Sequence, residues 1–298
     1  MSAGGRESGA PRPLPELPAD AHKGTAGRAL CVAGSRAMPG AAVLVARAAQ
    51  RAGAGLVSMA CLDPSLLSVL PVAAPEAVLV EAYDELLLSA EHSVDTLLDL
   101  RSSHARLVGP GLGDDERARF LVRGLLASDF AGPLALDADA LNALDGEPER
   151  VQAAGGPVVL TPHPGEAARL AGLSPADMPR DDGGRGELAR GLAARSGAVV
   201  CLKGRRTVVT DGERLYHNET GNAGMATAGS GDVLSGILVG YLARAAAARS
   251  ELDALELARL AVHVHGRAGD LAASELGPSA VVASDLIRFL PAAQRGLA

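Results

Sequence analysis

Short apolar runs alternate with longer amphipathic segments along most of this 298-residue chain. Runs of four or five residues rich in Val, Leu and Ala predict buried strands, and the segments between them predict helices. We expect strands at 29–33, 56–60, 77–80, 105–108, 133–136, 157–160 and 198–202, and helices at 41–52, 89–100, 114–128, 139–144, 167–171, 187–195, 233–242, 251–276 and 284–290. The order predicts an α/β fold with a mainly parallel central sheet flanked by helices on both faces.

Local signals refine these boundaries. Pro39-Gly40 is typical of a helix start, and Ser284 is a candidate cap for the last helix. Asp211-Gly212 predicts a hairpin between two short strands, and the polar segment 175–186 is expected to be an exposed connection.

The first twenty residues are rich in Pro, Gly and Ala but contain no continuous apolar run. We therefore expect residues 1–20 to be a flexible leader rather than a signal peptide, and residues 21–298 to form a single catalytic domain. Neither a fixed-period repeat nor an interdomain linker is visible.

Charge and cysteine usage narrow the class of protein. A net charge of −7 argues against nucleic-acid or membrane-surface binding, and the apolar runs are too short to span a membrane. Cys31, Cys61 and Cys201 are widely spaced and odd in number, so we expect buried free thiols, no metal site made from them, and a cytoplasmic location.

The segment from Asn222 to Asp232 contains the turn Ala-Gly-Ser-Gly (228–231) directly before an apolar helix. A glycine-rich turn at a helix start leaves unpaired N–H groups and partial positive charge, which suit a phosphate. Asp232 at the junction has two interpretations. It either favours the helix dipole or acts as a base towards a substrate beside the phosphate.

Polar or glycine-rich segments follow five of the predicted strands: Gly34-Ser35, Gly109–Gly113, Asp137–Asp139, His163–Glu166 and Lys203-Gly204. In an open parallel sheet these segments border one crevice where ligands bind. Their number predicts a small-molecule site that contains phosphate.

Each of these motifs also has a structural interpretation. Gly109–Gly113 could be only a tight turn, and it is not the dinucleotide fingerprint. For His163, between two prolines, we favour a ligand contact over the core; for Glu166 we favour a helix cap over a role in a metal–phosphate shell. His263 and His265 are expected to be packing or surface residues. The segment Lys203–Thr207 offers a cation and donors for a nucleotide phosphate, or forms an ordinary charged turn.

Eight motifs occur in one order: 23–28, 34–42, 51–57, 109–113, 136–142, 160–166, 203–204 and 222–232. Together they resemble the ADP-dependent NAD(P)H-hydrate dehydratase family, which has the ribokinase-like fold. The resemblance covers about residues 22–290. The length leaves no room for the family's separate epimerase domain, so we expect the stand-alone dehydratase.

The resemblance implies repair of damaged nicotinamide cofactor: the S-epimer of hydrated NADH or NADPH is dehydrated at the expense of ADP or ATP. It implies that Asp232 is catalytic and that Ala41, Gly113, His163 and Asp232 contact the hydrated cofactor. It assigns the nucleotide to Lys203, Gly204, Arg205, Arg206, Thr207, Gly229, Ser230 and Gly231. Mg²⁺ is expected to bridge the phosphates with few protein ligands, and no residue is singled out as a metal ligand.

The resemblance also implies a homo-oligomer, a homotetramer by analogy. Ser230 stands where the family more often has Thr, but the hydroxyl is retained. Aromatic residues make up 2% of the chain, so aliphatic walls and backbone groups must hold the bases. The alternatives are a ribokinase-like small-molecule kinase of the hydroxyethylthiazole or hydroxymethylpyrimidine type, and a non-catalytic nucleotide sensor.

Overall fold

The computed structural model describes residues 10–82, 102–295 and 297. Within them, nine strands form one sheet in the order β3-β2-β1-β4-β5-β6-β7-β8-β9. Pairing is parallel from β3 through β7, and β8 and β9 are antiparallel to their neighbours. The strands are β1 (Arg28–Val32), β2 (Leu56–Cys61), β3 (Val78–Glu81), β4 (Ala105–Val108), β5 (Leu134–Leu136), β6 (Val158–Leu160), β7 (Val199–Leu202), β8 (Val208–Thr210) and β9 (Leu215–His217). The predicted fold class is confirmed.

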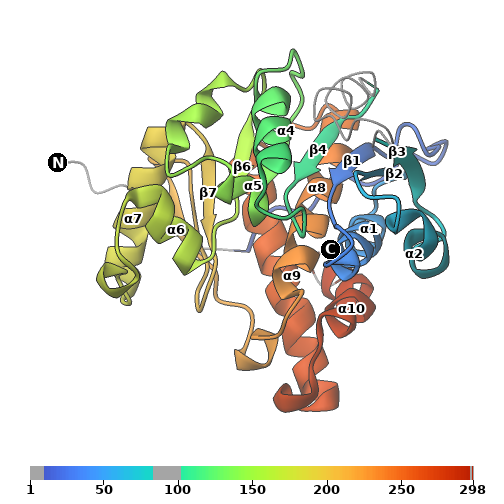
Figure 1. Ribbon diagram of the computed structural model, residues 1–298. Helices are drawn as coiled ribbons and strands as arrows, with labels where there is room; N and C mark the ends of the chain where they lie inside the picture. The colour runs from blue at the N-terminus through green and yellow to red at the C-terminus, as the bar shows by residue number, and fades with distance from the viewer. Residues whose placement is uncertain (1–9, 83–101, 296, 298) are drawn as a thin grey trace.

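Helices cover both faces of the sheet (Figure 1). One face packs against α1 (Pro39–Arg51), α2 (Leu66–Ala73), α8 (Ser230–Ala247), α9 (Ala254–Leu276) and α10 (Ala283–Arg295). The other packs against α4 (Glu116–Leu126), α5 (Asp139–Asn142), α6 (Pro164–Ala171) and α7 (Asp182–Ser196). Short 3₁₀ helices lie at Pro148–Ala153, Pro175–Asp177, Ala223–Met225 and Pro278–Ala280. Every strand except β3 contributes to both cores by alternation; Cys31 faces the first core, and Leu30 and Val32 face the second.

Several local predictions differ from the structure. Helix α7 begins at Asp182, inside the segment expected to be a connection, because Asp181 caps it by accepting the N–H of Gly184 at 2.9 Å. Ser284 is no cap, since α10 begins at Ala283 and Ser284 lies within it. Helix α2 was not predicted; it carries Pro71 within its span. The helix expected at 89–100 lies outside the described residues.

The cysteine prediction is confirmed for the thiols themselves. Cys31, Cys61 and Cys201 lie in β1, β2 and β7, and all three are buried and free. Burial raises the pKa of the Cys31 thiol to about 12, so it stays protonated. In the described part of the chain, no helix is long and apolar enough to cross a membrane.

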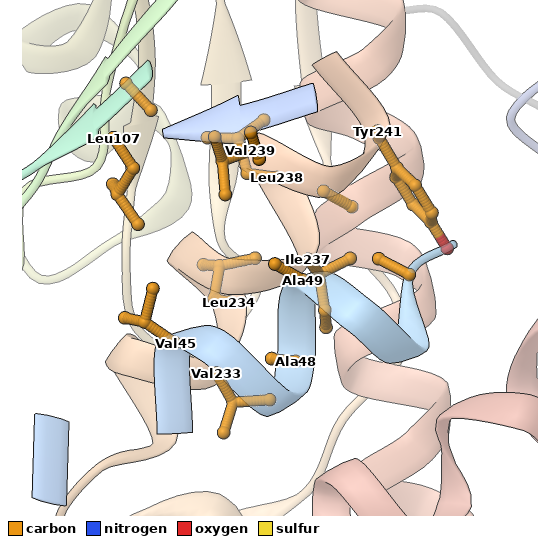
Figure 2. Close-up of a cluster of buried hydrophobic side chains, with 14 of the residues drawn as sticks. Val45, Ala48, Ala49, Leu107, Val233, Leu234, Ile237, Leu238, Val239 and Tyr241 are labelled. Atoms are coloured by element: carbon orange, nitrogen blue, oxygen red, sulfur yellow. The ribbon is translucent and has the colours of Figure 1, made fainter. Parts of the chain in front are cut away.

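Helices α1 and α8 approach each other closely through two glycines. A Cβ on Gly236 would lie 2.6 Å from the Cβ of Ala48, and one on Gly240 would lie 2.7 Å from the Cβ of Ala52. In Figure 2, Ala48 and Ala49 of α1 lie beside Ile237 of α8 in the apolar layer beneath the sheet. This contact sets the position of α8, whose first residues are the predicted phosphate site.

Candidate active site at the carboxyl edge of the sheet

The loops after β1, β4, β5, β6 and β7 meet at one edge, because these five strands are parallel neighbours. The chain order reverses between β1 and β4, which is the switch point where open α/β sheets bind ligands. There the N–H of Gly34 donates to the carbonyl of Pro110 at 2.7 Å. Gly109 has a φ of 132°, and a Cβ on it would overlap the carbonyl oxygen of Asp137. Glycine is therefore required for the loops to pack against one another.

Two residues assigned to the hydrated cofactor lie at this switch point. Ala41 is in the first turn of α1, and a Cβ on Gly111 would come within 2.8 Å of its methyl group. Gly113, two residues further on, donates its N–H to the carboxylate of Asp139 at 2.8 Å. The side of Gly113 where a Cβ would project is open. The start of α1 at Ala41 and the loop that carries Gly113 are therefore neighbours, with open space at Gly113.

A buried charge network lies on the next strands. Asp137 is 1% exposed; one of its carboxylate oxygens accepts from the Lys203 ammonium at 2.6 Å and the other from the Ser235 hydroxyl at 2.7 Å. Burial by itself lowers the pKa of Lys203, but the carboxylates of Asp137, Glu166 and Asp232 outweigh it and raise that pKa. Lys203 is therefore a fixed positive charge.

Ala138 separates the two carboxylates of this turn with a φ of 50° and a ψ of −119°. Such a conformation costs a non-glycine residue about 1–3 kcal/mol. It allows Asp137 to hold Lys203 while Asp139, two residues on, holds the Gly113 loop. One strained residue thus serves both sides of the site.

The N-terminus of α8 completes the cluster. Gly229 has a left-handed φ of 84°, and a Cβ on Gly231 would lie 3.4 Å from the Lys203 nitrogen. Burial and the charge of Asp137 raise the pKa of Asp232 to about 6, although Lys203 opposes the shift. A carboxylate with such a pKa is a better proton acceptor than an ordinary aspartate, because it holds the proton more tightly once it has it.

His163 and Glu166 begin α6 with a reciprocal capping box. The His163 ring accepts the N–H of Gly165 at 2.9 Å, and the Glu166 carboxylate accepts the N–H of His163 at 2.7 Å. The predicted cap role of Glu166 is confirmed. His163 keeps 56% of its side chain exposed, so it is not a core residue. Burial raises the pKa of Glu166 to about 7, with Lys203 opposing the shift.

The segment Lys203–Thr207 is the hairpin connection from β7 to β8. Arg205 and Arg206 are exposed, and Arg206 forms an ion pair with Asp182. The Thr207 hydroxyl donates to the carbonyl of Gly204 at 3.1 Å. The structure thus brings the two proposed nucleotide segments, 203–207 and 229–231, together at Lys203.

Sequence reasoning missed some side chains at this edge. His265, expected to be a packing or surface residue, places Nε2 at 2.9 Å from the Ser230 carbonyl and 3.3 Å from its hydroxyl. Its pKa falls to about 4 because of burial, so the ring is neutral and can donate to the carbonyl. Arg185 and Ser235 were likewise not singled out. The spacing of α9 relative to α8 is a tertiary fact that no local motif encodes.

Among the described residues, no group of three or more His, Cys, Asp or Glu side chains converges as a metal cage.

The nine-stranded sheet, the switch-point loops and the lysine–carboxylate cluster at the start of α8 define the chain as a ribokinase-like α/β protein. Residues 29–292 match the family model described as NAD(P)H-hydrate dehydratase. The chain belongs to that family.

Relatives of known sequence and structure agree with this assignment. The chain is 42% identical over 289 residues to a bifunctional NAD(P)H-hydrate repair enzyme of Moorella thermoacetica, covering 95% of this chain and 52% of that protein. The chain thus spans about half the length of the first curated relatives it matches. It is 38% identical to an ADP-dependent (S)-NAD(P)H-hydrate dehydratase of Neisseria meningitidis, covering 88% and 82% of the two chains.

A solved structure from Bacillus subtilis superposes with a TM-score of 0.78 at 31% identity, covering 96% of this chain and 95% of that one. That protein is an ADP/ATP-dependent NAD(P)H-hydrate dehydratase co-crystallised with ATP and Mg²⁺.

Proposed function

We propose that this protein dehydrates the S-epimer of hydrated NADH or NADPH back to the dihydropyridine cofactor, using ADP or ATP. The observation that carries the proposal is the meeting of Lys203 and Asp232 at the start of α8. Lys203 is fixed there by Asp137 at 2.6 Å, beside Gly231. The Neisseria meningitidis and Bacillus subtilis relatives, which are NAD(P)H-hydrate dehydratases that use ADP or ADP/ATP, support it.

In this proposal the carboxyl edge of the sheet binds two ligands. Ala41, Gly113, His163 and Asp232 bind the hydrated cofactor, and Lys203–Thr207 with Gly229–Gly231 bind the nucleotide. Ala41 and Gly113 lie at the switch point, His163 follows β6, and Asp232 lies in the first turn of α8 next to the nucleotide set, so the ligands would meet at Asp232. Aliphatic and backbone surfaces would hold the rings, since the chain has no Trp.

The chemistry follows from leaving-group ability. Asp232 takes the proton of the ring hydroxyl. At the same time the hydroxyl oxygen forms a bond to the terminal phosphorus of the nucleotide, and the bond from that phosphorus to the rest of the nucleotide breaks. The backbone N–H groups at the start of α8 and the Lys203 ammonium stabilise the moving negative charge. The ring nitrogen then expels phosphate, the neighbouring carbon loses a proton, and the double bond is restored.

We assign Mg²⁺ to the nucleotide phosphates, where it would neutralise charge on the transferring group. The acidic surroundings of Lys203 suit a cation. Asp137, Glu166 and Asp232 all act on this one ammonium. Of these, Glu166 caps α6 and Asp232 is the proposed base, so we assign no protein side chain to the ion.

The test is to incubate the purified protein with hydrated NADH or NADPH, Mg²⁺ and either ADP or ATP. The absorbance of the restored dihydropyridine is then followed. We expect recovery that depends on nucleotide and is lost in Asp232→Asn, which still binds nucleotide. Phosphorylated substrate that accumulates without recovery would indicate a kinase, and no reaction with either nucleotide would refute the proposal.

A homo-oligomer of four subunits and a cytoplasmic location belong to the same proposal. Sedimentation equilibrium of the purified chain measures the first, and a monomer at micromolar concentration would contradict it.

A further inference from the structure

Arg185 is a buried charge that pairs with backbone rather than with an acid. It lies at the end of the first turn of α7 and is 7% exposed. Among the described residues, its recorded hydrogen bonds go to the carbonyls of Leu202 and Lys203, each at 3.2 Å, and of Arg205. All three carbonyls lie in or next to the segment Lys203–Thr207.

This placement is costly by ordinary rules. Burying a guanidinium without a hydrogen-bonded carboxylate loses hydration that carbonyl oxygens only partly replace. A cation near the N-terminus of a helix is also disfavoured by the helix dipole. Burial lowers the pKa of Arg185, and the carboxylate of Asp182 opposes the shift. These costs point to a role for Arg185 in the segment whose carbonyls it binds.

The effect of Arg185 on this segment is visible in the direction of the peptide groups. In a trans peptide the C=O and the following N–H point in opposite directions. Because Arg185 draws in the carbonyls of Lys203 and Arg205, the N–H groups of Gly204 and Arg206 point away from it. Within the part of the chain that the structure describes, neither N–H has a recorded hydrogen-bond partner. Free N–H groups that point to the same side of a turn suit an anion.

The conformation of the segment agrees with this account. Gly204 has a φ of 135°, and a Cβ there would lie 3.0 Å from a terminal nitrogen of Arg185. Arg206 adopts a left-handed φ of 54°, which costs a non-glycine residue about 1–2 kcal/mol. Contacts on both sides hold this strained turn: Arg185 beneath it and the ion pair of Arg206 with Asp182 beside it.

We propose that Arg185 is the positioning residue of the nucleotide segment. By holding the carbonyls of Lys203 and Arg205 inward, it presents the N–H groups of Gly204 and Arg206 to an anionic group of the bound nucleotide. This inference rests on the proposed nucleotide-dependent function but concerns binding of one ligand alone. Arg185 therefore acts on nucleotide affinity rather than on proton transfer at Asp232.

The same helix supplies a matched control. Arg190 also lies in α7 and also donates to two backbone carbonyls, those of Gly212 at 3.1 Å and Glu213 at 2.9 Å. These carbonyls belong to the turn between β8 and β9, away from the segment 203–207. Arg190→Met thus removes a guanidinium–carbonyl contact of the same kind from α7 without touching the nucleotide segment.

The experiment measures the Kd of ADP with Mg²⁺, and separately that of the hydrated cofactor, by titration calorimetry. We expect Arg185→Met to weaken nucleotide binding roughly tenfold or more, equivalent to about 1.4 kcal/mol, and to leave the hydrated cofactor within about twofold. The nucleotide affinity of Arg185→Lys should be close to that of Arg185→Met, because one ammonium cannot reproduce the guanidinium fork that bonds separate carbonyls. Arg190→Met should bind both ligands as the wild type does.

Unchanged nucleotide affinity in Arg185→Met would overturn the inference, as would an equal loss for both ligands. If Arg185→Lys bound the nucleotide as tightly as the wild type, the positive charge alone would explain the effect, and the positioning role would also be overturned. If Arg185→Met does not fold, the Lys variant decides. Wild-type protein that binds nucleotide but restores no dihydropyridine would contradict the proposed function and leave this inference standing.

Discussion

Replacing the carboxylate of Asp232 with an amide is expected to abolish turnover and to stabilise the fold. Burial and Asp137 raise its folded-state pKa to about 6 from an ordinary value of 3.8. Between pH 3.8 and about 6, the folded protein therefore keeps a proton on Asp232 that the unfolded chain has already released. Ionisation of Asp232 therefore costs the folded state free energy. This cost is absent below the unfolded-state pKa and complete once the pH has risen through the folded-state pKa. Asp232→Asn removes it.

The magnitude follows from the two pKa values. By proton linkage, ionisation of Asp232 costs the fold about 1.6 kcal/mol near pH 5 and about 3 kcal/mol near pH 8. The gain in stability of Asp232→Asn over the wild type should therefore grow by about 1.4 kcal/mol across this interval. The interaction with Lys203 is already contained in the folded-state pKa.

Urea denaturation of the wild type and of Asp232→Asn at both pH values measures the difference. Glu116→Gln is the control, because Glu116 is an exposed carboxylate in the first turn of α4. Its loss should cost a few tenths of a kcal/mol through the helix dipole. A gain for Asp232→Asn that does not grow with pH would refute the assignment of a partly buried base with a raised pKa. Undiminished turnover would remove Asp232 from the chemistry.

Three further changes test the scaffold and the network. Gly236→Ala should destabilise by about 1–3 kcal/mol through overpacking against α1, whereas Gly191→Ala, with open space at its Cβ, should stabilise by about 0.5–1 kcal/mol; thermal unfolding of both compares them. Burial lowers the pKa of His265 from 6.5 in the unfolded chain to about 4 in the folded protein. The stability that neutral His265 contributes is therefore present above pH 6.5 and falls with the pH, by about 2 kcal/mol between pH 7 and pH 5. Denaturation of His265→Gln should show a correspondingly flatter pH profile, and an identical profile would contradict this. Asp137→Asn should cost about 3 kcal/mol and most of the activity by leaving Lys203 without its hydrogen-bonded carboxylate. A double-mutant cycle with Lys203→Met should then show a smaller combined loss than the sum.

Much of the sheet was predictable because most of its parallel strands are buried on both faces and read as largely apolar runs. The strands at Leu134–Leu136 and Val199–Leu202 are examples. The start of α7 was not predictable in the same way. Its first residues are Asp-Gly-Gly-Arg-Gly, which propensity assigns to a loop. The cap from Asp181 and the contacts of Arg185 with the neighbouring hairpin stabilise the helix there.

The site divides along the same line. Loops after strands were predictable, because strand direction alone brings their residues to one edge. The partners were not, since the Asp137–Lys203 and Ser230–His265 pairs join residues far apart in the chain. Two carboxylates and a lysine in a sequence carry no sign of which of them are buried together. The role of Arg185 depends on peptide orientation, which no residue pattern records.

The two antiparallel strands at the end of the sheet have a consequence for chain direction. Strand β8 carries the chain away from the edge where Lys203 lies, and β9 carries it back. An even number of reversals returns the backbone to the edge from which it left, so the stretch after His217 enters α8 beside the other loops. With a single reversal, α8 would begin at the opposite edge, and its positive end would face away from every other ligand-binding loop. The small hairpin therefore places the turn after β7 and the N-terminus of α8 at the same edge of the sheet, where the proposed nucleotide would meet both.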